Sequence, residues 1–484
     1  MNLVLYPRAS PCDRLTIWAG VFQKIQVPGG LTWQLNGIDT TPSVVRPMSS
    51  VRPTPVVDPN VPRVFSGVYE FVGLKSDTVY EVSLTTDEDH TSTKIRTLPE
   101  HIPSSVGDSF NLLLVSCFHQ AEDRGGMAGT IVSQLKASSK PHLTLLMGDQ
   151  VYLDLPTLRN FDDDVAWLAD KFERDYAQNW EKPPGYAQVL SAAPSASLPD
   201  DHEYWNNFPH VSPIIQNSWT KEGRARWKQA ADMMYEGFQS WSVGLGDPYV
   251  LNIEPLSFFL ADGRSRRDFK RGSMMTAAAM ARLKQWVDDV IRQRRVGVFV
   301  TGQSLFEDAK GTLQGKVADY AMADYSDYAP LIRTLARLAE NGRPLLCLTG
   351  DVHWGRVVAS RDLGSQRNAM YEIISSPASL VTTIGADSLK EIGAIIDGSI
   401  GSRNPWPRHS DPEPPPEYLA HDVLSKAFQC QSVHAQKGNH VTLVSFTRDG
   451  TGLSMRITYW PVDPNRRETA PVQLPDIKIP GSLI

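Results

Sequence analysis

The stretch LTLLMGDQVYLD, residues 143–154, decides the fold class of this chain. Its five leading residues form a short apolar run of the kind that a strand buried on both faces requires. Gly148 then permits a tight turn, and Asp149 follows directly after the strand. An apolar strand that ends in a carboxylate indicates an α/β domain with a site at the strand end.

Four other apolar runs also stop at a polar residue, and helical patterns separate them. The runs cover residues 111–117, 256–262, 296–303 and 345–351, and the helical patterns cover 125–138, 161–179, 221–242, 276–293 and 326–340. Because ligands bind at the carboxyl ends of strands in α/β sheets, we expect the five polar strand ends to face one crevice.

The first 105 residues have a different pattern, with short alternating runs such as LTIWAGVF and FSGVYEFV separated by turn residues. This pattern predicts an all-β sandwich. Residues 73–84 and 94–99 resemble the late strands of fibronectin type III domains. We therefore predict two domains, a β-sandwich at 1–105 and a catalytic α/β domain at 106–484. Near the other end, 440–446 and 453–460 predict a hairpin.

Composition excludes several classes of protein. The 484 residues are 41% hydrophobic and 21% charged with a net charge of −6, so neither a membrane-spanning protein nor a nucleic-acid scaffold is expected. The four cysteines are too far apart for a disulfide framework or a zinc knuckle. The first residues contain no readable signal peptide, which predicts a cytoplasmic protein as the chain is written, or an exported one if it is a trimmed mature form.

Three short clusters carry the candidate chemistry. Asp149 has two oxygens that can bridge two cations, although it can also cap a helix. Asp351 and His353 have a common metal-ligand spacing, with a capped loop as the alternative. Residues 199–207 contain four consecutive ionisable residues, which otherwise form a solvated acidic loop.

Taken together, these residues resemble the alkaline phosphatase D (PhoD-like) metallophosphatases, a family of the calcineurin-like metallophosphoesterase superfamily. The resemblance extends over the whole chain. Its motifs are Ser116-Cys117, GDQVY at 148–152, DDHE at 200–203 with Asn206-Asn207, ADGRSR at 261–266, Gln285-Trp286 and LTGDVHW at 348–354. The family fold implied is a layered β-sheet sandwich flanked by helices, preceded by a fibronectin-like domain.

The resemblance also implies a set of metal ligands. Cys117 as thiolate, Asp149 and Tyr152 as phenolate would hold Fe³⁺, and Asp149 would bridge to further metals. Asp201 would bind the second metal, and Asp351 and His353 stand where the superfamily has its final pair of histidines. Calcium is implied at the non-iron positions, with manganese or zinc as alternatives, and hard cations suit oxygen ligands.

Other positions carry implied roles in binding and catalysis. His202 falls at the catalytic position beside the leaving oxygen, and Arg264 would clamp phosphoryl oxygens, with Arg266 and Arg267 as competitors. Trp354 is a candidate to stack on substrate. Two of these residues have a purely structural alternative. Cys117 can be a small buried hydrophobic residue, and Tyr152 can be an ordinary half-buried aromatic residue. The sequence GNH at 438–440 mimics a superfamily motif, and we interpret it as structural.

The predicted function is a metal-dependent phosphoric ester hydrolase, an alkaline phosphatase or phosphodiesterase that attacks phosphorus with a metal-activated hydroxide. The expected substrate is a small-molecule or polymer phosphoester. One alternative is a catalytically inactive binding or scaffold protein containing a β-sandwich. The other is a hydrolase of a different ester in the same metal site. The Pro-rich residues 401–418 are predicted to form an ordered excursion or a lid.

Overall fold

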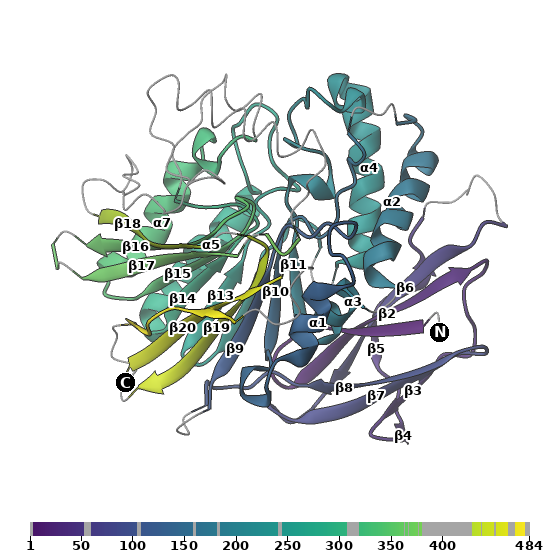
Figure 1. The fold of residues 1–484 in the computed structure, drawn as a ribbon, viewed down its shortest axis with the longest axis horizontal. Coiled ribbons are helices and arrows are strands. Elements are labelled where there is room, and N and C mark those ends of the chain that lie inside the picture. Colours follow the sequence, from purple (N-terminus) through teal and green to yellow (C-terminus); the bar gives the residue numbers. More distant parts are fainter. Residues whose placement is uncertain are drawn as a thin grey trace.

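The computed structural model describes residues 3–52, 60–103, 108–157, 161–181, 184–240, 244–306, 319–362, 364–365, 367–375, 377–379, 428–436, 438–449, 452–462 and 470–479. The predicted lid at 401–418 lies outside these ranges. The described chain is a mixed α/β structure of several sheets and few helices, which confirms the fold class at that level (Figure 1). No helix of the described ranges is long and apolar enough to cross a membrane.

The largest sheet has 11 strands and contains the strand quoted at the start of the sequence analysis. Its central strands β9, β10 and β11 are parallel. In spatial order its strands are β21 (Val472–Gln473), β20 (Gly452–Pro461), β19 (His440–Asp449), β9 (Phe110–Val115), β10 (Leu143–Met147), β11 (Ser195–Leu198), β1 (Leu3–Arg8), β2 (Arg14–Lys24), β6 (Arg63–Val72) and β5 (Ser43–Ser50), with β22 (Ile477–Ile479) beside β20. The predicted C-terminal hairpin is β19 and β20.

A second sheet of 7 strands holds the other three predicted strand ends. The five polar strand ends therefore come from two sheets, since β9 and β10 lie in the first and β13, β14 and β15 in the second. The order in the second sheet is β12 (Tyr249–Ile253), β13 (Leu256–Leu260), β14 (Val296–Val300), β15 (Leu345–Thr349), β17 (Asn368–Ile374), β16 (Gly355–Asp362) and β18 (Phe428–Gln436).

Helices cover the outer sides of the two sheets. In Figure 1, α2 and α4 lie on one side of the molecule and α5 and α7 on the other. The helices are α1 (Met127–Gln134), α2 (Val165–Trp180), α3 (Tyr186–Ser191), α4 (Lys221–Phe238), α5 (Ala277–Gln293) and α7 (Tyr328–Glu340). Side-chain caps fix several starts, because Asp164, Thr220 and Thr276 each accept a backbone N–H of the first turn.

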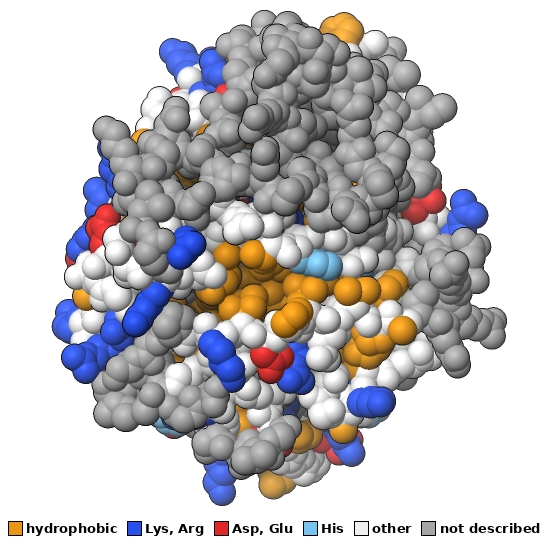
Figure 2. Space-filling model, turned by 60° about the vertical axis from the view of Figure 1, so that its left-hand side comes forward, with side chains coloured by type: hydrophobic (Ala, Val, Ile, Leu, Met, Phe, Trp, Pro, Cys, Tyr) orange, Lys and Arg blue, Asp and Glu red, His pale blue; other side chains and the backbone are white. Residues whose placement is uncertain are grey.

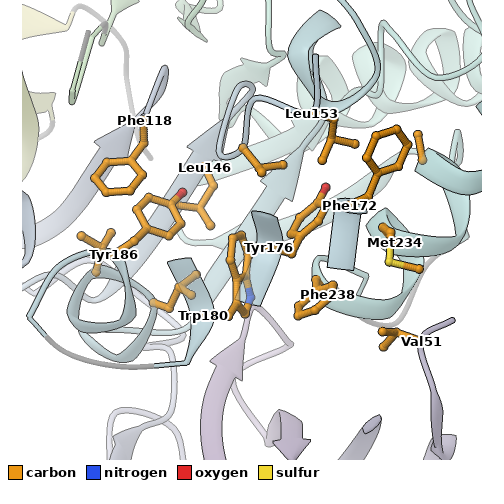
Figure 3. Close-up of a cluster of buried hydrophobic side chains, with 14 of the residues drawn as sticks. Val51, Phe118, Leu146, Leu153, Phe172, Tyr176, Trp180, Tyr186, Met234 and Phe238 are labelled. Carbon is orange, nitrogen blue, oxygen red and sulfur yellow. The ribbon is translucent and has the colours of Figure 1, made fainter. Parts of the chain in front are cut away.

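Two large apolar clusters lie between these layers. One takes side chains from both large sheets, such as Leu145 and Val298, so the sheets face each other across it. A second, rich in aromatic residues, lies under α1 to α4, and Figure 3 shows Phe118, Tyr186, Trp180 and Phe238 within it. The rings of Phe118 and Tyr186 are 4.5 Å apart, which anchors the chain directly beyond β9.

The N-terminal residues form two β-layers with an apolar core of their own, which includes Ile17, Trp33 and Leu84. One layer is β1, β2, β6 and β5, and the other is the four-stranded sheet β4 (Ile38–Asp39), β3 (Thr32–Leu35), β7 (Val79–Thr85) and β8 (His90–Arg96). The first layer is continuous with the largest sheet, because β1 pairs in parallel with β11. The fibronectin-like assignment and the boundary at 105 stay predictions.

Figure 2 shows one face of the molecule in space-filling form. Hydrophobic side chains gather near its centre beside a histidine, and Lys and Arg side chains are scattered around them. This face shows no concentration of positive charge, in keeping with the net charge of −6.

Candidate metal centre

Three of the predicted ligands stand at strand ends in a rare backbone conformation. Cys117 follows β9, Asp149 follows β10 and Asp351 follows β15, with φ values of 53°, 58° and 72°. Non-glycine residues seldom adopt positive φ, and such strain concentrates at functional sites. The Oγ atom of Ser116 accepts a hydrogen bond from the backbone N–H of Asp351 at 3.3 Å, so the two sheets are joined at this point.

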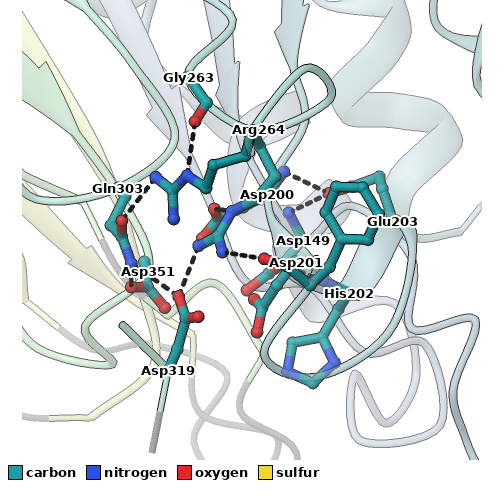
Figure 4. A network of polar contacts seen from close by, with 12 residues as sticks. Asp149, Asp200, Asp201, His202, Glu203, Gly263, Arg264, Gln303, Asp319 and Asp351 are labelled. Atoms are coloured by element: carbon teal, nitrogen blue, oxygen red, sulfur yellow. Dashed lines mark hydrogen bonds and ion pairs between the residues drawn. The ribbon is translucent and has the colours of Figure 1, made fainter. Parts of the chain in front are cut away.

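Side-chain atoms suitable for cations converge at these strand ends. Asp149 belongs to each of three sets in which one ligand atom per residue lies within 4.8 Å of the others. The sets are Cys117, Asp149 and His353; Asp149, Asp201 and His202; and Asp149, Asp200, Asp201 and Asp351. Figure 4 shows the labelled aspartates lying close together around Arg264. The structure thus brings most of the predicted ligands together around one shared carboxylate.

Two carboxylates of this cluster fit cations because each has one buried oxygen without a donor. Asp200 and Asp201 are 1% and 0% exposed, and Asp200 Oδ2 and Asp201 Oδ1 accept no hydrogen bond within the described chain. Burial, against a smaller opposing effect of His202, raises the pKa of Asp201 to about 6. A buried oxygen without a donor is costly, and a bound cation removes that cost.

Glu203 holds two of the ligand-bearing loops in register. Its carboxylate accepts the backbone N–H groups of Asp149 at 2.8 Å, Gln150 at 2.6 Å and Asp200 at 2.8 Å. Burial and the charge of Asp149 raise the pKa of Glu203 to about 8. Glu203 therefore caps the loop, while a different carboxylate orients His202.

That carboxylate is Asp154. Its Oδ1 atom lies 2.9 Å from Nδ1 of His202, and both side chains are 1% exposed. The Nε2 atom of His202 has no hydrogen-bond partner within the described chain. Although burial lowers the pKa of His202, the charges of Asp154 and Asp201 raise it well above its ordinary value.

Arg264 lies at the base of the cluster and is only 1% exposed. Its Nε donates to Asp200 Oδ1 at 2.5 Å, its Nη2 to Asp319 Oδ2 at 2.6 Å, and its Nη1 to the carbonyl of Phe208 at 2.8 Å. All three nitrogens are thus engaged by the protein. The phosphoryl clamp expected of Arg264 stays a prediction, since in this structure the side chain fixes two aspartates.

Gln303 lies three residues beyond the end of β14. Its Nε2 donates to Asp319 Oδ2 at 2.7 Å and to Asp351 Oδ2 at 3.3 Å, and its Oε1 accepts from Arg267 at 2.8 Å. The amide of Gln303 therefore links Arg267, Asp319 and Asp351 by hydrogen bonds.

The remaining predicted residues lie around the cluster. The ring of Tyr152 is 4.3 Å from that of His202 between centroids and 5% exposed. His353 has φ 56° and is partly exposed, as is Trp354 next to it. His440, of the GNH sequence, is buried, contacts the carbonyl of Gly438 through Nδ1 at 2.7 Å, and packs edge-on against Tyr459.

Sequence reasoning missed four residues at this site. Asp154 lies in the stretch 143–154 and Asp200 in the DDHE motif, but the predicted roles were assigned to neighbouring residues. His119 faces Tyr152 with ring centroids 5.6 Å apart, and its signal was a Cys-x-His spacing that repeats Asp-x-His at 351–353. Asp319 stands in none of the motifs singled out in the sequence, so no sequence pattern marked it.

The fold and the cluster together define an α/β protein with a candidate metal centre between two sheets. No protein-family model matches the chain, and no curated protein matches it. A solved structure described as "Structure of PhoD" is similar over 99% of this chain and 91% of its own, with a TM-score of 0.62 and 13% sequence identity. At that identity the likeness shows a PhoD-like fold.

Proposed function

We propose that this protein is a metal-dependent phosphoric ester hydrolase. The observation that carries the proposal is the set of four buried aspartates, Asp149, Asp200, Asp201 and Asp351, whose oxygens lie within 4.8 Å of one another. Such a concentration of carboxylates suits more than one hard cation. The PhoD-like fold supports the same proposal, and the set lies just beyond the ends of β10, β11 and β15 in two facing sheets.

We assign the cations as the resemblance to the PhoD-like family implies, and the chemistry of the ligands is compatible with that assignment. A thiolate at Cys117 and a phenolate at Tyr152, together with Asp149, suit Fe³⁺, while the aspartate-rich side suits Ca²⁺, with Mn²⁺ or Zn²⁺ as alternatives. When bound, these cations supply positive charge to the phosphoryl oxygens and lower the pKa of a coordinated water. Substrate is a small-molecule or polymer phosphoester in this proposal.

His202 supplies the proton that the leaving oxygen needs. Asp154 accepts a hydrogen bond from Nδ1 of His202, and this bond leaves Nε2 on the opposite side of the ring. The charge of Asp154 contributes to the raised pKa of His202, and this contact favours the protonated imidazole in which Nε2–H is a donor. The role of His202 is therefore that of a general acid held in one orientation by a buried carboxylate.

An ester panel tests the proposal against its alternatives. Wild-type protein and Asp149→Asn are assayed with p-nitrophenyl phosphate, bis-p-nitrophenyl phosphate and p-nitrophenyl acetate, and Asp288→Asn is the control because its side chain is 57% exposed on α5. We expect wild type and Asp288→Asn to hydrolyse a phosphate ester and Asp149→Asn to lose that activity. Hydrolysis of the acetate alone would favour another ester, and no hydrolysis after metal loading would favour a scaffold protein.

A further inference from the structure

Arg267 is a buried arginine three residues beyond Arg264, and its guanidinium is held from several sides. The side chain is 6% exposed. Its Nε donates to the carbonyl of Gly263 at 2.9 Å and its Nη2 to Gln303 Oε1 at 2.8 Å. Figure 4 labels Gly263 and Gln303, the two residues that accept these hydrogen bonds. The guanidinium also lies over the ring of Tyr325, 4.8 Å from the centroid.

The third nitrogen of this guanidinium is not used. Nη1 of Arg267 is buried and has no hydrogen-bond partner within the described part of the chain, whereas all three nitrogens of Arg264 have partners. A charged donor that is buried without an acceptor is strongly unfavourable. Among the described residues, Nη1 of Arg267 is therefore the nitrogen of this guanidinium that is left for a further acceptor.

The charges around Arg267 indicate what that acceptor is. Asp319 contacts the same Gln303 amide, and its Oδ1 atom also lacks a partner in the described chain, yet the two side chains form no ion pair with each other. Gln303 continues to Asp351 Oδ2 at 3.3 Å, at the edge of the aspartate cluster. Carboxylate oxygens without a donor favour binding of cations. A guanidinium nitrogen without an acceptor beside them favours binding of an anion, which the cations also attract.

We propose that Nη1 of Arg267 donates a hydrogen bond to a phosphoryl oxygen of the substrate and of the phosphate product. This inference rests on the proposed function, and it assigns the contact with phosphate to Arg267, while Arg264 positions Asp200 and Asp319. A guanidinium nitrogen suits this contact, because hydrogen bonds from an ionised donor to phosphate are stronger than those between neutral groups. The hydrogen bonds to Gly263 and Gln303 fix the orientation of the Arg267 guanidinium in the absence of substrate.

Calorimetric titration of inorganic phosphate into the metal-loaded protein tests this contact without relying on turnover. The variants are Arg267→Met and Arg267→Lys. Arg266→Met is the matched control, because Arg266 is exposed and its guanidinium donates to the carbonyl of Leu245. A hydrogen bond to a charged group predicts phosphate binding roughly 10- to 100-fold weaker in Arg267→Met. Arg266→Met should bind phosphate as wild type does.

Arg267→Lys keeps the experiment decisive if Arg267→Met does not fold. Lysine retains the charge but cannot donate to Gly263, Gln303 and phosphate in the same geometry, so we expect normal metal content and phosphate binding roughly 10-fold weaker. Wild-type phosphate affinity in a folded, metal-loaded Arg267 variant would overturn the inference and leave the proposed function intact. Metal analysis of each sample distinguishes failure of this contact from failure of the proposed function. Wild-type protein that holds no metal and hydrolyses no ester would overturn both.

Discussion

The sulfur of Cys117 lies 3.5 Å from Oδ2 of Asp149, and the two residues end adjacent parallel strands of the largest sheet. Both have positive φ, so the backbone turns sharply at each to bring the side chains together. A sulfur atom beside a carboxylate suits a transition-metal ion better than calcium, which prefers oxygen alone. This pair therefore distinguishes one side of the centre from the aspartate-rich side.

Replacing Cys117 with serine should remove the softer ligand and leave the aspartates in place. We expect Cys117→Ser to lose iron and any thiolate or phenolate charge-transfer band while retaining the other cations, as measured by plasma mass spectrometry and visible absorption. Cys12→Ser is the control, because Cys12 is a partly exposed free cysteine. An unchanged iron content and spectrum in Cys117→Ser would contradict the assignment.

Asp154→Asn should impair catalysis without emptying the metal centre. Asparagine cannot stabilise the protonated imidazole of His202, and loss of such an orienting partner typically costs about 10- to 100-fold in activity. We expect kcat for phosphate-ester hydrolysis to fall in that range with unchanged metal content, and the pH profile to shift. Retention of the wild-type kcat and pH profile would show that Asp154 has only a structural role.

Arg264→Met should destabilise the fold. Removing one partner from a buried ion pair typically costs about 3–5 kcal/mol, and Arg264 pairs with two aspartates that are each 1% exposed. The exposed pair of Arg337 and Asp288 gives the control, since Arg337→Met should cost less than about 1 kcal/mol. Urea unfolding followed by tryptophan fluorescence measures both. If Arg264→Met were as stable as wild type and changed only KM, the substrate-clamp interpretation of Arg264 would be favoured.

His440 should make the protein less stable in acid. Burial, despite the contact with the Gly438 carbonyl, lowers the pKa of His440 from 6.5 to about 4. Between these values the unfolded chain takes up a proton that the folded chain does not, so stability is complete above pH 6.5 and falls as the pH drops toward 4. Between about pH 7 and pH 5, the free energy of unfolding should therefore fall in both proteins, and the fall should be smaller in His440→Gln by on the order of 2 kcal/mol. Equal losses in urea unfolding would show that His440 does not titrate as expected.

Much of the site could be predicted from local sequence because its ligands follow apolar strands. The runs before Cys117, Asp149 and Asp351 are each short, apolar and interrupted by a polar residue, which is enough to place three residues at strand ends. Their common location also followed from the rule that sites form at the carboxyl ends of strands. These inferences needed only periodicity and the chemistry of single residues.

Long-range pairing and side-chain direction could not be predicted in this way. The division of five strands between two sheets, and the pairing of β1 with β11, join residues far apart in the chain and leave no local pattern. Arg264 and Arg267 are nearly indistinguishable in sequence, yet their hydrogen bonds differ in number because each guanidinium meets a different set of acceptors. Asp319 joins the site only through tertiary contacts.

The most direct test of the metal-dependent hydrolase is to strip the protein of metal and add back iron, calcium, manganese and zinc. Bound metal is measured by plasma mass spectrometry and hydrolysis of p-nitrophenyl phosphate and bis-p-nitrophenyl phosphate is measured on the same samples. We predict that activity returns in proportion to bound metal in wild type and stays absent in Asp149→Asn. Wild-type protein that binds none of the four metals, or that hydrolyses neither ester once loaded, would contradict the account.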